Sequence, residues 1–202
     1  MTFDRPSTRP PEWAEALLRL LLKPEDRESV SGDLLEEYRQ TAVPARGKGA
    51  DAWYVRQVAG FLWRATWIWS LVFAALFVSR TAYDWLVPTT QFATRSAVST
   101  WSGVAVLFIV GASAAWRSRS FVAGLLVAMI TSQVAAVMSV VGAAILLAIW
   151  HDAGTQRAIA GSGGLEEVFI LPFVMIIPAV IVGSVASAAA GLGRRICSSF
   201  VG

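Results

Sequence analysis

Thirty consecutive residues, from Phe121 to Trp150, carry no formally charged side chain. As a helix with a rise of about 1.5 Å per residue, this run would extend roughly 45 Å, beyond the roughly 30 Å hydrocarbon core of a bilayer. It is too short to form two spans. The run therefore predicts a single transmembrane helix that tilts or protrudes from the bilayer.

Three further apolar stretches are long enough to cross a membrane. They run over 65–79 (or on to 87, if Arg80 snorkels to the interface), over 98–116 and over 168–193, with the uncharged run occupying 121–150. Hydrophobic residues make up 55% of the chain and charged residues 15%, against about 25% charged residues in soluble domains. The sequence predicts an all-α protein in which residues 65–202 form a four-helix transmembrane bundle.

Aromatic and basic residues predict the membrane boundaries and the orientation. Tryptophans, whose amphipathic rings favour the headgroup level, gather toward the ends of the spans at Trp63, Trp67, Trp69, Trp85, Trp101, Trp116 and Trp150. With the N-terminus inside, the cytosolic side receives Arg46, Lys48, Arg56, Arg64, Arg117, Arg119, Arg194 and Arg195. The outer connections then keep only Arg80, Arg95 and Arg157. This excess of inner basic residues predicts that both termini are cytosolic.

The net charge of +3 is unevenly distributed along the chain. Residues 1–64 hold ten basic and ten acidic residues, whereas residues 65–202 hold seven basic and four acidic residues. A neutral polar segment lacks the electrostatic footprint that nucleic acid requires. The basic excess beside the spans suits anionic headgroups, so the predicted partner is the lipid bilayer and not nucleic acid.

The polar N-terminal third predicts a cytosolic helical hairpin over 1–42, a linker over 43–50 and a juxtamembrane helix over 51–64. Trp13, Leu17, Leu20 and Leu21 recur at helical spacing, and so do Val30, Leu34 and Tyr38. Gly32 interrupts the second helix, where it predicts a close contact or a bend. The juxtamembrane helix either lies in the interface or extends the first span into the cytosol.

Residues 11–58 resemble a known family through WAEALLRLLLKPEDRESVSGDLLEEYRQ and the later WYVRQV. They are similar to the N-terminal permease prefix domain that precedes some macrolide-export-type ABC transporter permeases, notably in Acidobacteria. This chain departs from those permeases because its outer connections are too short to hold a large periplasmic domain. The resemblance implies an association with an ABC export system in a bacterial inner membrane, and it supplies no catalytic residue.

The sequence contains few residues that could form a catalytic or metal-binding site. Cys197 is the only cysteine and His151 the only histidine, so no disulfide, metal site or cofactor site is predicted. Ser162 could be considered as a protease nucleophile with His151, but both fall in a predicted loop outside the membrane. The spans contain Gln133, Thr131 and Ser132 as their most polar cluster, and Gln133 is predicted to form a hydrogen bond between helices.

Small residues recur every four positions in three of the spans, where they allow helix backbones to approach closely. The predicted packing residues are Gly111, Ala115, Ser139, Ala143, Gly183, Ser187 and Gly191, joined by Ala135. They either close the bundle or join subunits of a homo-oligomer. Pro172 and Pro178 are predicted to bend the fourth span.

The leading hypothesis is a non-enzymatic inner-membrane adaptor or regulatory partner of an ABC permease or its regulator. The hypothetical docking residues are Asp33, Glu36, Glu37, Tyr38 and Arg39 on the second prefix helix. The alternative is a small oligomeric transporter or channel-like protein, in which Gln133 and the bent fourth span would be the moving parts.

Overall fold

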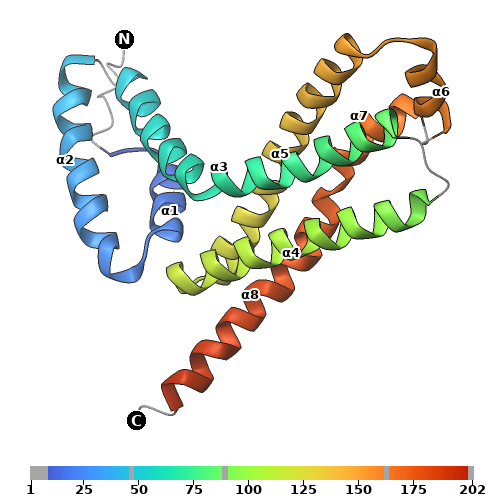
Figure 1. The fold of residues 1–202 in the computed structure, drawn as a ribbon. Coiled ribbons are helices and arrows are strands. Elements are labelled where there is room, and N and C mark those ends of the chain that lie inside the picture. The colour runs from blue at the N-terminus through green and yellow to red at the C-terminus, as the bar shows by residue number, and fades with distance from the viewer. Residues whose placement is uncertain (1–8, 46–47, 88–90, 162–163, 200–202) are drawn as a thin grey trace.

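The computed structural model describes residues 9–45, 48–87, 91–161 and 164–199, and these residues form helices and short connections but no strand. The helices are α1 (Glu12–Leu21), the 3-10 helix η1 (Pro24–Asp26), α2 (Arg27–Ala45), α3 (Lys48–Leu86), α4 (Phe92–Ser118), α5 (Phe121–Ile149), α6 (Ala153–Gly161), α7 (Gly164–Val174) and α8 (Ile176–Ser199). The predicted all-α class is confirmed. Figure 1 shows α1 and α2 at one end of a bundle of long helices.

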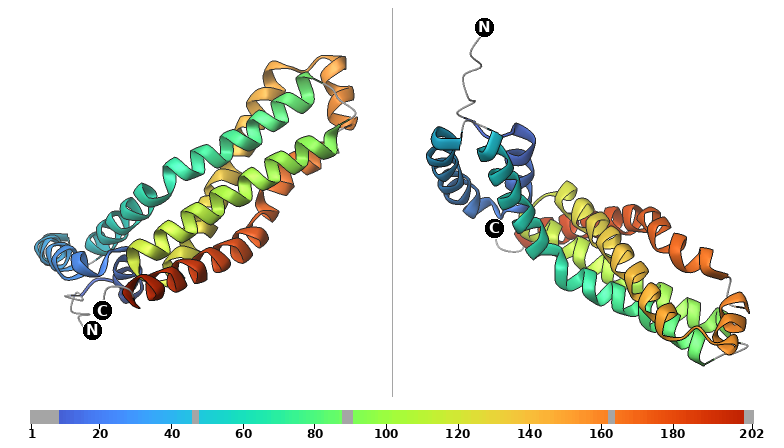
Figure 2. Two further views of the ribbon diagram at one scale, coloured as in Figure 1. Left: turned by 60° about the horizontal axis from the view of Figure 1, so that its bottom comes forward. Right: turned by 90° about the horizontal axis from the view of Figure 1, so that it is seen from above.

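Four segments of the described chain are long and apolar enough to cross a membrane, which makes this a multi-pass membrane protein. They are Gly49–Leu86, Ala93–Ser118, Phe121–Ile149 and Pro172–Ser199. Large apolar side chains remain exposed along their outer surfaces, with Val98 and Trp101 64% and 71% exposed. Such a surface is suited to lipid and not to water. In Figure 2 the four long helices run side by side, with α1 and α2 at one end and α6 and α7 at the other.

The predicted linker over 43–50 was wrong, because its described residues are helical. Residues 43–45 end α2 and residues 48–50 begin α3, while 46 and 47 lie outside the described residues. Gly49 lies in the first turn of α3, where glycine costs less than in the middle of a helix, and Pro44 lies one residue before the end of α2, so the composition of this segment did not prevent helix formation. The predicted juxtamembrane helix and first span are therefore parts of one 39-residue helix, α3.

The helices α1, η1 and α2, together called the prefix from here on, form a unit with the beginning of α3. Ala14 and Leu18 from α1, Leu34 and Tyr38 from α2, and Ala50, Tyr54 and Val58 from α3 make one buried cluster. Both α1 and α2 contact α3 more extensively than they contact each other. The packed unit is therefore larger than the predicted hairpin, and it includes the helix that enters the bundle. Trp13, predicted on the apolar stripe, is instead 60% exposed.

Two prolines interrupt the fourth span, which was predicted to bend. The helix breaks at Met175, so that α7 ends at Val174 and α8 begins at Ile176. Pro172 lies inside α7 and Pro178 in the first turn of α8. Pro178 has no N–H to donate to the carbonyl of Val174, which is why the helical ladder is broken at this level.

The connection between α5 and α7 contains α6, which sequence patterning did not predict. Asp152 begins this helix, because its carboxylate accepts hydrogen bonds from the N–H groups of Gly154 at 2.8 Å and Thr155 at 3.1 Å. Hydrogen bonds from the Thr155 hydroxyl and from these two N–H groups hold the pKa of Asp152 below its ordinary value. Trp85, predicted at headgroup level, is instead buried against Ile159 of α6 and Ala143 of α5.

The closest helix contacts in the bundle are made by glycines. A Cβ on Gly124 of α5 would collide with Ser187 Oγ and would lie 2.5 Å from the carbonyl oxygen of Gly111 and 2.7 Å from Ala115 Cβ. A Cβ on Gly183 would lie 2.9 Å from Ala128 Cβ. Gly124 therefore joins α4, α5 and α8 at the point where their backbones approach most closely.

The predicted packing residues divide into three groups. Gly111, Ala115, Gly183 and Ser187 lie buried at this meeting point, and Ser139 and Ala143 are buried elsewhere on α5. Gly191 makes no close contact with the described part of the chain. The nearest atom to a Cβ at this position would be Arg194 Nη2, at 3.9 Å. Gly124, which the four-residue spacing missed, takes the central place. A Cβ on Gly32 would meet nothing within 4 Å, so Gly32 makes no close contact, and α2 continues through it without a break.

We expect Gly124→Ala to destabilise the bundle by about 1–3 kcal/mol, because the added methyl overpacks a site lined by backbone. Unfolding by SDS titration of the purified protein measures this loss. Gly32→Ala is the matched control, since the same methyl enters open space on a helix and should be neutral or stabilising by up to about 1 kcal/mol. Equal behaviour of the two variants would contradict the assigned close packing.

Candidate functional site

The outward face of α2 carries the predicted docking residues. Asp33, Glu36, Glu37 and Arg39 are exposed on it. Tyr38 is fully buried, so its assignment to a docking surface was wrong. One helical face cannot hold all five neighbouring residues, because successive residues are about 100° apart around the axis. The docking face is therefore defined here as Asp33, Glu36, Glu37 and Arg39.

Tyr38 holds the prefix together from inside. Its hydroxyl donates a hydrogen bond to Asp51 Oδ1 at 2.6 Å, and the carbonyl of Arg9 is a second acceptor at 3.1 Å. Its ring meets that of Tyr54 edge to face, with centroids 5.8 Å apart. The residue thus links α2 to the start of α3 and lies directly behind the docking face.

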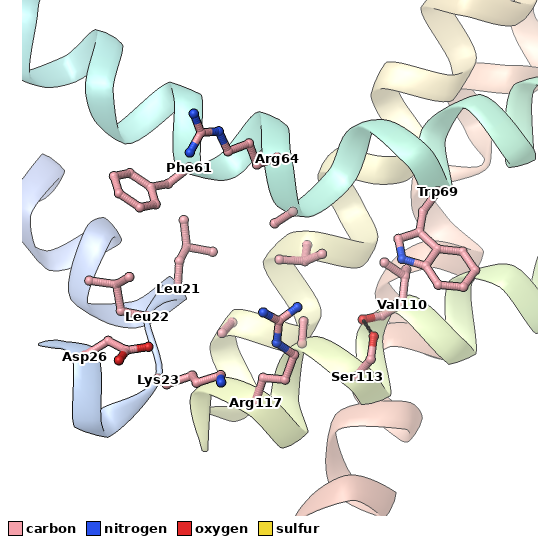
Figure 3. A pocket seen from close by; sticks show the side chains of 14 residues that line it. Leu21, Leu22, Lys23, Asp26, Phe61, Arg64, Trp69, Val110, Ser113 and Arg117 are labelled. Atoms are coloured by element: carbon pink, nitrogen blue, oxygen red, sulfur yellow. Dashed lines mark hydrogen bonds between the residues drawn. The ribbon is translucent and has the colours of Figure 1, made fainter. Parts of the chain in front are cut away.

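A cavity of about 310 Å³ lies where the prefix meets the bundle, between the end of α1, η1, the middle of α3, the last turns of α4 and the first turns of α5 (Figure 3). Its apolar wall includes Leu21, Phe61, Trp69, Val110 and Val127. Leu21 also packs on the buried cluster that contains Val110 and Val127. We call this cavity the junction crevice.

Four charged side chains line the junction crevice: Lys23, Asp26, Arg64 and Arg117. In Figure 3 the amine of Lys23 points toward the stem of Arg117, the guanidinium of Arg117 points toward α3, and Arg64 lies across the crevice on α3. The ion pairs found among the described residues involve none of these four side chains. The crevice therefore combines an apolar wall with an excess of two positive charges.

The prefix is attached to the bundle beside the crevice. Arg27 Nη2 donates a hydrogen bond to the carbonyl oxygen of Ser118 at 2.7 Å, and Arg27 Nε donates to the carbonyl of Leu22 at 3.4 Å. Ser118 ends α4, and Arg119 follows it with φ 53° in the turn to α5. An arginine that donates to the last carbonyls of a helix also complements the helix dipole.

At the opposite end of the bundle, Asp84 is a buried acid inside α3. Its carboxylate pairs with Arg80 at 3.4 Å and with Arg95 of α4 at 3.3 Å. Gln133, Thr131 and Ser132 were predicted to be the most polar cluster of the spans, whereas the end of the first span holds this buried acid with its two arginines. The signal was present in the sequence, because Arg80 and Asp84 are four residues apart and form a helical pair once α3 continues past Ser79.

Arg95 also caps the end of α3. It donates to the carbonyl oxygens of Tyr83 at 3.1 Å and Val87 at 2.8 Å, and its guanidinium lies 4.3 Å from the centroid of the Tyr83 ring. The carbonyl of Tyr83 also accepts the N–H of Val87 at 3.0 Å, so Arg95 adds a second hydrogen bond there and gives the carbonyl of Val87 a partner just past the helix end. The cluster therefore ties the end of α3 to the start of α4, and Asp84 neutralises one of its two positive charges.

Polar groups in the middle of the bundle lie mainly on α5. Gln133 Nε2 donates to the carbonyl of Phe173 at 3.4 Å, beside the break between α7 and α8. Ser70 Oγ donates to the carbonyl of Thr131 at 3.4 Å. The hydroxyls of Thr131 and Ser132 are buried, and no hydrogen-bond partner is found for them within the described part of the chain.

The residues considered for catalysis are not brought together. His151 is exposed at the end of α5, and Ser162 lies outside the described residues. Cys197 is exposed near the end of α8. Within residues that the structure describes, no group of three or more His, Cys, Asp or Glu side chains is placed to hold a metal ion.

Comparison of the chain with known proteins yields no match to a family model, to a curated protein or to a solved structure.

We expect Asp84→Asn to lower the free energy of unfolding by about 2 kcal/mol, because two arginines lose their buried counter-charge. SDS-induced unfolding measures the loss. A double-mutant cycle with Arg95→Gln should show a coupling energy, since the two side chains share one contact. Arg157→Gln removes an exposed arginine at the same end of the bundle and should be neutral. Strict additivity of Asp84→Asn and Arg95→Gln would contradict the pairing.

Proposed function

We propose that this protein is a non-enzymatic membrane adaptor, in which the docking face of α2 receives a protein partner and the transmembrane bundle holds that partner at the membrane. The resemblance of residues 11–58 to permease prefix domains favours a component or regulator of an ABC export system as the partner. It also favours the inner membrane of a bacterium as the location, with both termini in the cytosol.

The observation that carries this proposal is the two-sided character of α2. One side is buried against α1 and α3 through Leu34 and Tyr38, whereas the side with Asp33 and Glu36 is left exposed by the rest of the chain. Because α3 continues without interruption from this unit into the bundle, a partner on α2 would be attached through a rigid helix. Buried tyrosines make such a support well ordered.

The charges at the two ends of the bundle support the proposed orientation. Arg64, Arg117, Arg119, Arg194 and Arg195 lie at the end that carries the prefix. At the other end, the described residues hold three arginines, Arg80, Arg95 and Arg157, two of which pair with Asp84. The positive-inside rule then places the prefix in the cytosol.

We expect Asp33→Asn, Glu36→Gln and Glu37→Gln together to reduce recovery of the partner in a crosslinking pulldown by roughly tenfold, equivalent to about 1.4 kcal/mol. The matched control carries Glu12→Gln, Glu25→Gln and Glu28→Gln, which remove three exposed acids of the prefix outside the docking face. Its partner list should match that of the unmodified protein. An unchanged list for the docking-face variant would refute the adaptor proposal.

A transport function is the second candidate, because the helix break at Met175 and the Gln133–Phe173 hydrogen bond place a polar contact beside a discontinuous span. Discontinuous helices in transporters expose backbone groups that bind substrate. The buried hydroxyls of Thr131 and Ser132 supply further polar groups on α5. In this candidate function, several copies of the chain would assemble and a solute would pass through the assembly.

Liposome flux with the purified protein separates the two candidates. If the protein transports, Gln133→Leu should abolish flux of an ion or amphiphile, because the polar contact at the break is lost. Gln156→Leu, at an exposed position of α6, should leave that flux unchanged. Absence of flux across a panel of ions and amphiphiles is the result expected of an adaptor.

A further inference from the structure

The junction crevice lies at the level where α3, α4 and α5 pass from water to hydrocarbon. Arg64 is the last charged residue of α3 before a run of apolar residues, and Arg117 is the first charged residue after the apolar run of α4. Deeper into the bundle, the crevice wall is formed by Trp69, Val110 and Val127. The crevice therefore has a basic mouth and an apolar interior, in the same order as a lipid headgroup and its chains.

The basic residues at the mouth come from three separate elements. Lys23 precedes η1, Arg64 belongs to α3 and Arg117 to the last turn of α4. All three side chains are at exposed positions, and no ion pair within the described residues neutralises them. Asp26 is the one acid among the described residues of the lining, so an anion that enters the crevice meets an excess of positive charge.

We propose that the junction crevice binds an anionic phospholipid of the surrounding leaflet. The headgroup phosphate lies between Lys23 and Arg117, with Arg64 on the other side, and the first part of the acyl chains lies along Trp69, Val110 and Val127. Basic pockets between transmembrane helices at the cytosolic face are suited to anionic headgroups for the same electrostatic reason. The proposal does not depend on the partner of the docking face.

The apolar wall favours a lipid over a free anion. A soluble phosphate would leave Leu21, Phe61 and Trp69 in contact with water, whereas an acyl chain would cover them. The cavity volume of about 310 Å³ is at the lower end of the range for small-molecule sites. It is therefore large enough for a headgroup and the adjoining chain segments, and the remaining chain would lie in the bilayer.

Binding at this place would join the prefix to the bundle. Lys23 belongs to the connection between α1 and η1, and Arg117 belongs to α4, so one phosphate would bridge them. In the protein alone, the contact between these parts includes the hydrogen bond from Arg27 to Ser118 and the packing of Leu21 on Val110 and Val127. An anionic lipid would add a charge-assisted bridge to this contact.

Native mass spectrometry of the full chain, released from detergent in the presence of phosphatidylglycerol or phosphatidylcholine, tests the proposal. We expect phosphatidylglycerol to be retained in preference to phosphatidylcholine. Lys23→Gln and Arg117→Gln should each weaken phosphatidylglycerol binding by about fivefold, the effect of one basic residue near an anionic lipid surface. Both positions are exposed, and a thermal melt of each variant verifies that it is folded.

Arg119→Asn is the matched control. Arg119 is exposed two residues beyond Arg117, outside the crevice, and asparagine tolerates its left-handed backbone conformation. It should retain phosphatidylglycerol as the unmodified protein does. Equal retention of the two lipids, or equal weakening by the control, would overturn the proposal. Displacement of phosphatidylglycerol by millimolar inorganic phosphate would also overturn it, because it would identify a site for a free anion.

Discussion

The close approach of three helix backbones at Gly124 is the constraint on which the rest of the bundle depends. Within lipid, apolar side chains gain little by leaving the hydrocarbon, so helices associate through packing and polar contacts. Gly124 allows α5 to lie directly against Gly111 of α4 and Ser187 of α8. This contact sets the position of the α4–α5 turn, on which Arg27 of the prefix forms its hydrogen bond.

The charged residues are arranged differently at the two ends of the bundle. At the end with α6, Asp84 pairs with Arg80 and Arg95, and Arg95 also donates to the carbonyls of Tyr83 and Val87 at the end of α3. Those side chains are engaged with one another, and they leave an excess of one positive charge, against two in the junction crevice. At the end with the prefix, Lys23 and Arg117 face a crevice whose deeper wall is apolar. This difference is why the prefix end, and not the other end, is assigned a ligand.

The prefix gains its order from α3, because two short helices bury too little surface to be stable alone. Tyr38 illustrates this dependence, since its hydroxyl and its ring both contact residues at the start of α3. The docking face is on α2, whereas the described residues that line the junction crevice come from α1, η1, α3, α4 and α5 and from the turn before η1. A protein partner and a lipid could therefore be bound at the same time.

Local sequence determined the helical character of the chain and the position of the apolar spans, because run length and polarity are properties of neighbouring residues. It also indicated the interruption near Pro172 and Pro178, since a missing N–H acts on the helix that contains it. The continuous helix over 51–86 was less clear, because Gly49 and Arg80 suggested boundaries that the packed structure does not have.

Only the tertiary structure decided how each helix is rotated about its axis and which positions along neighbouring helices are in contact. The spacing of Val30, Leu34 and Tyr38 placed the tyrosine on an apolar stripe, but only packing on α3 shows that it is fully buried while its neighbour Glu37 stays exposed. Gly124 is central and Gly191 is not, although both are glycines in apolar helices. The pairing of Asp84 with Arg95 and the junction crevice likewise arise between separate helices. Their geometry depends on rotation and register between segments distant in the chain, which no local pattern specifies.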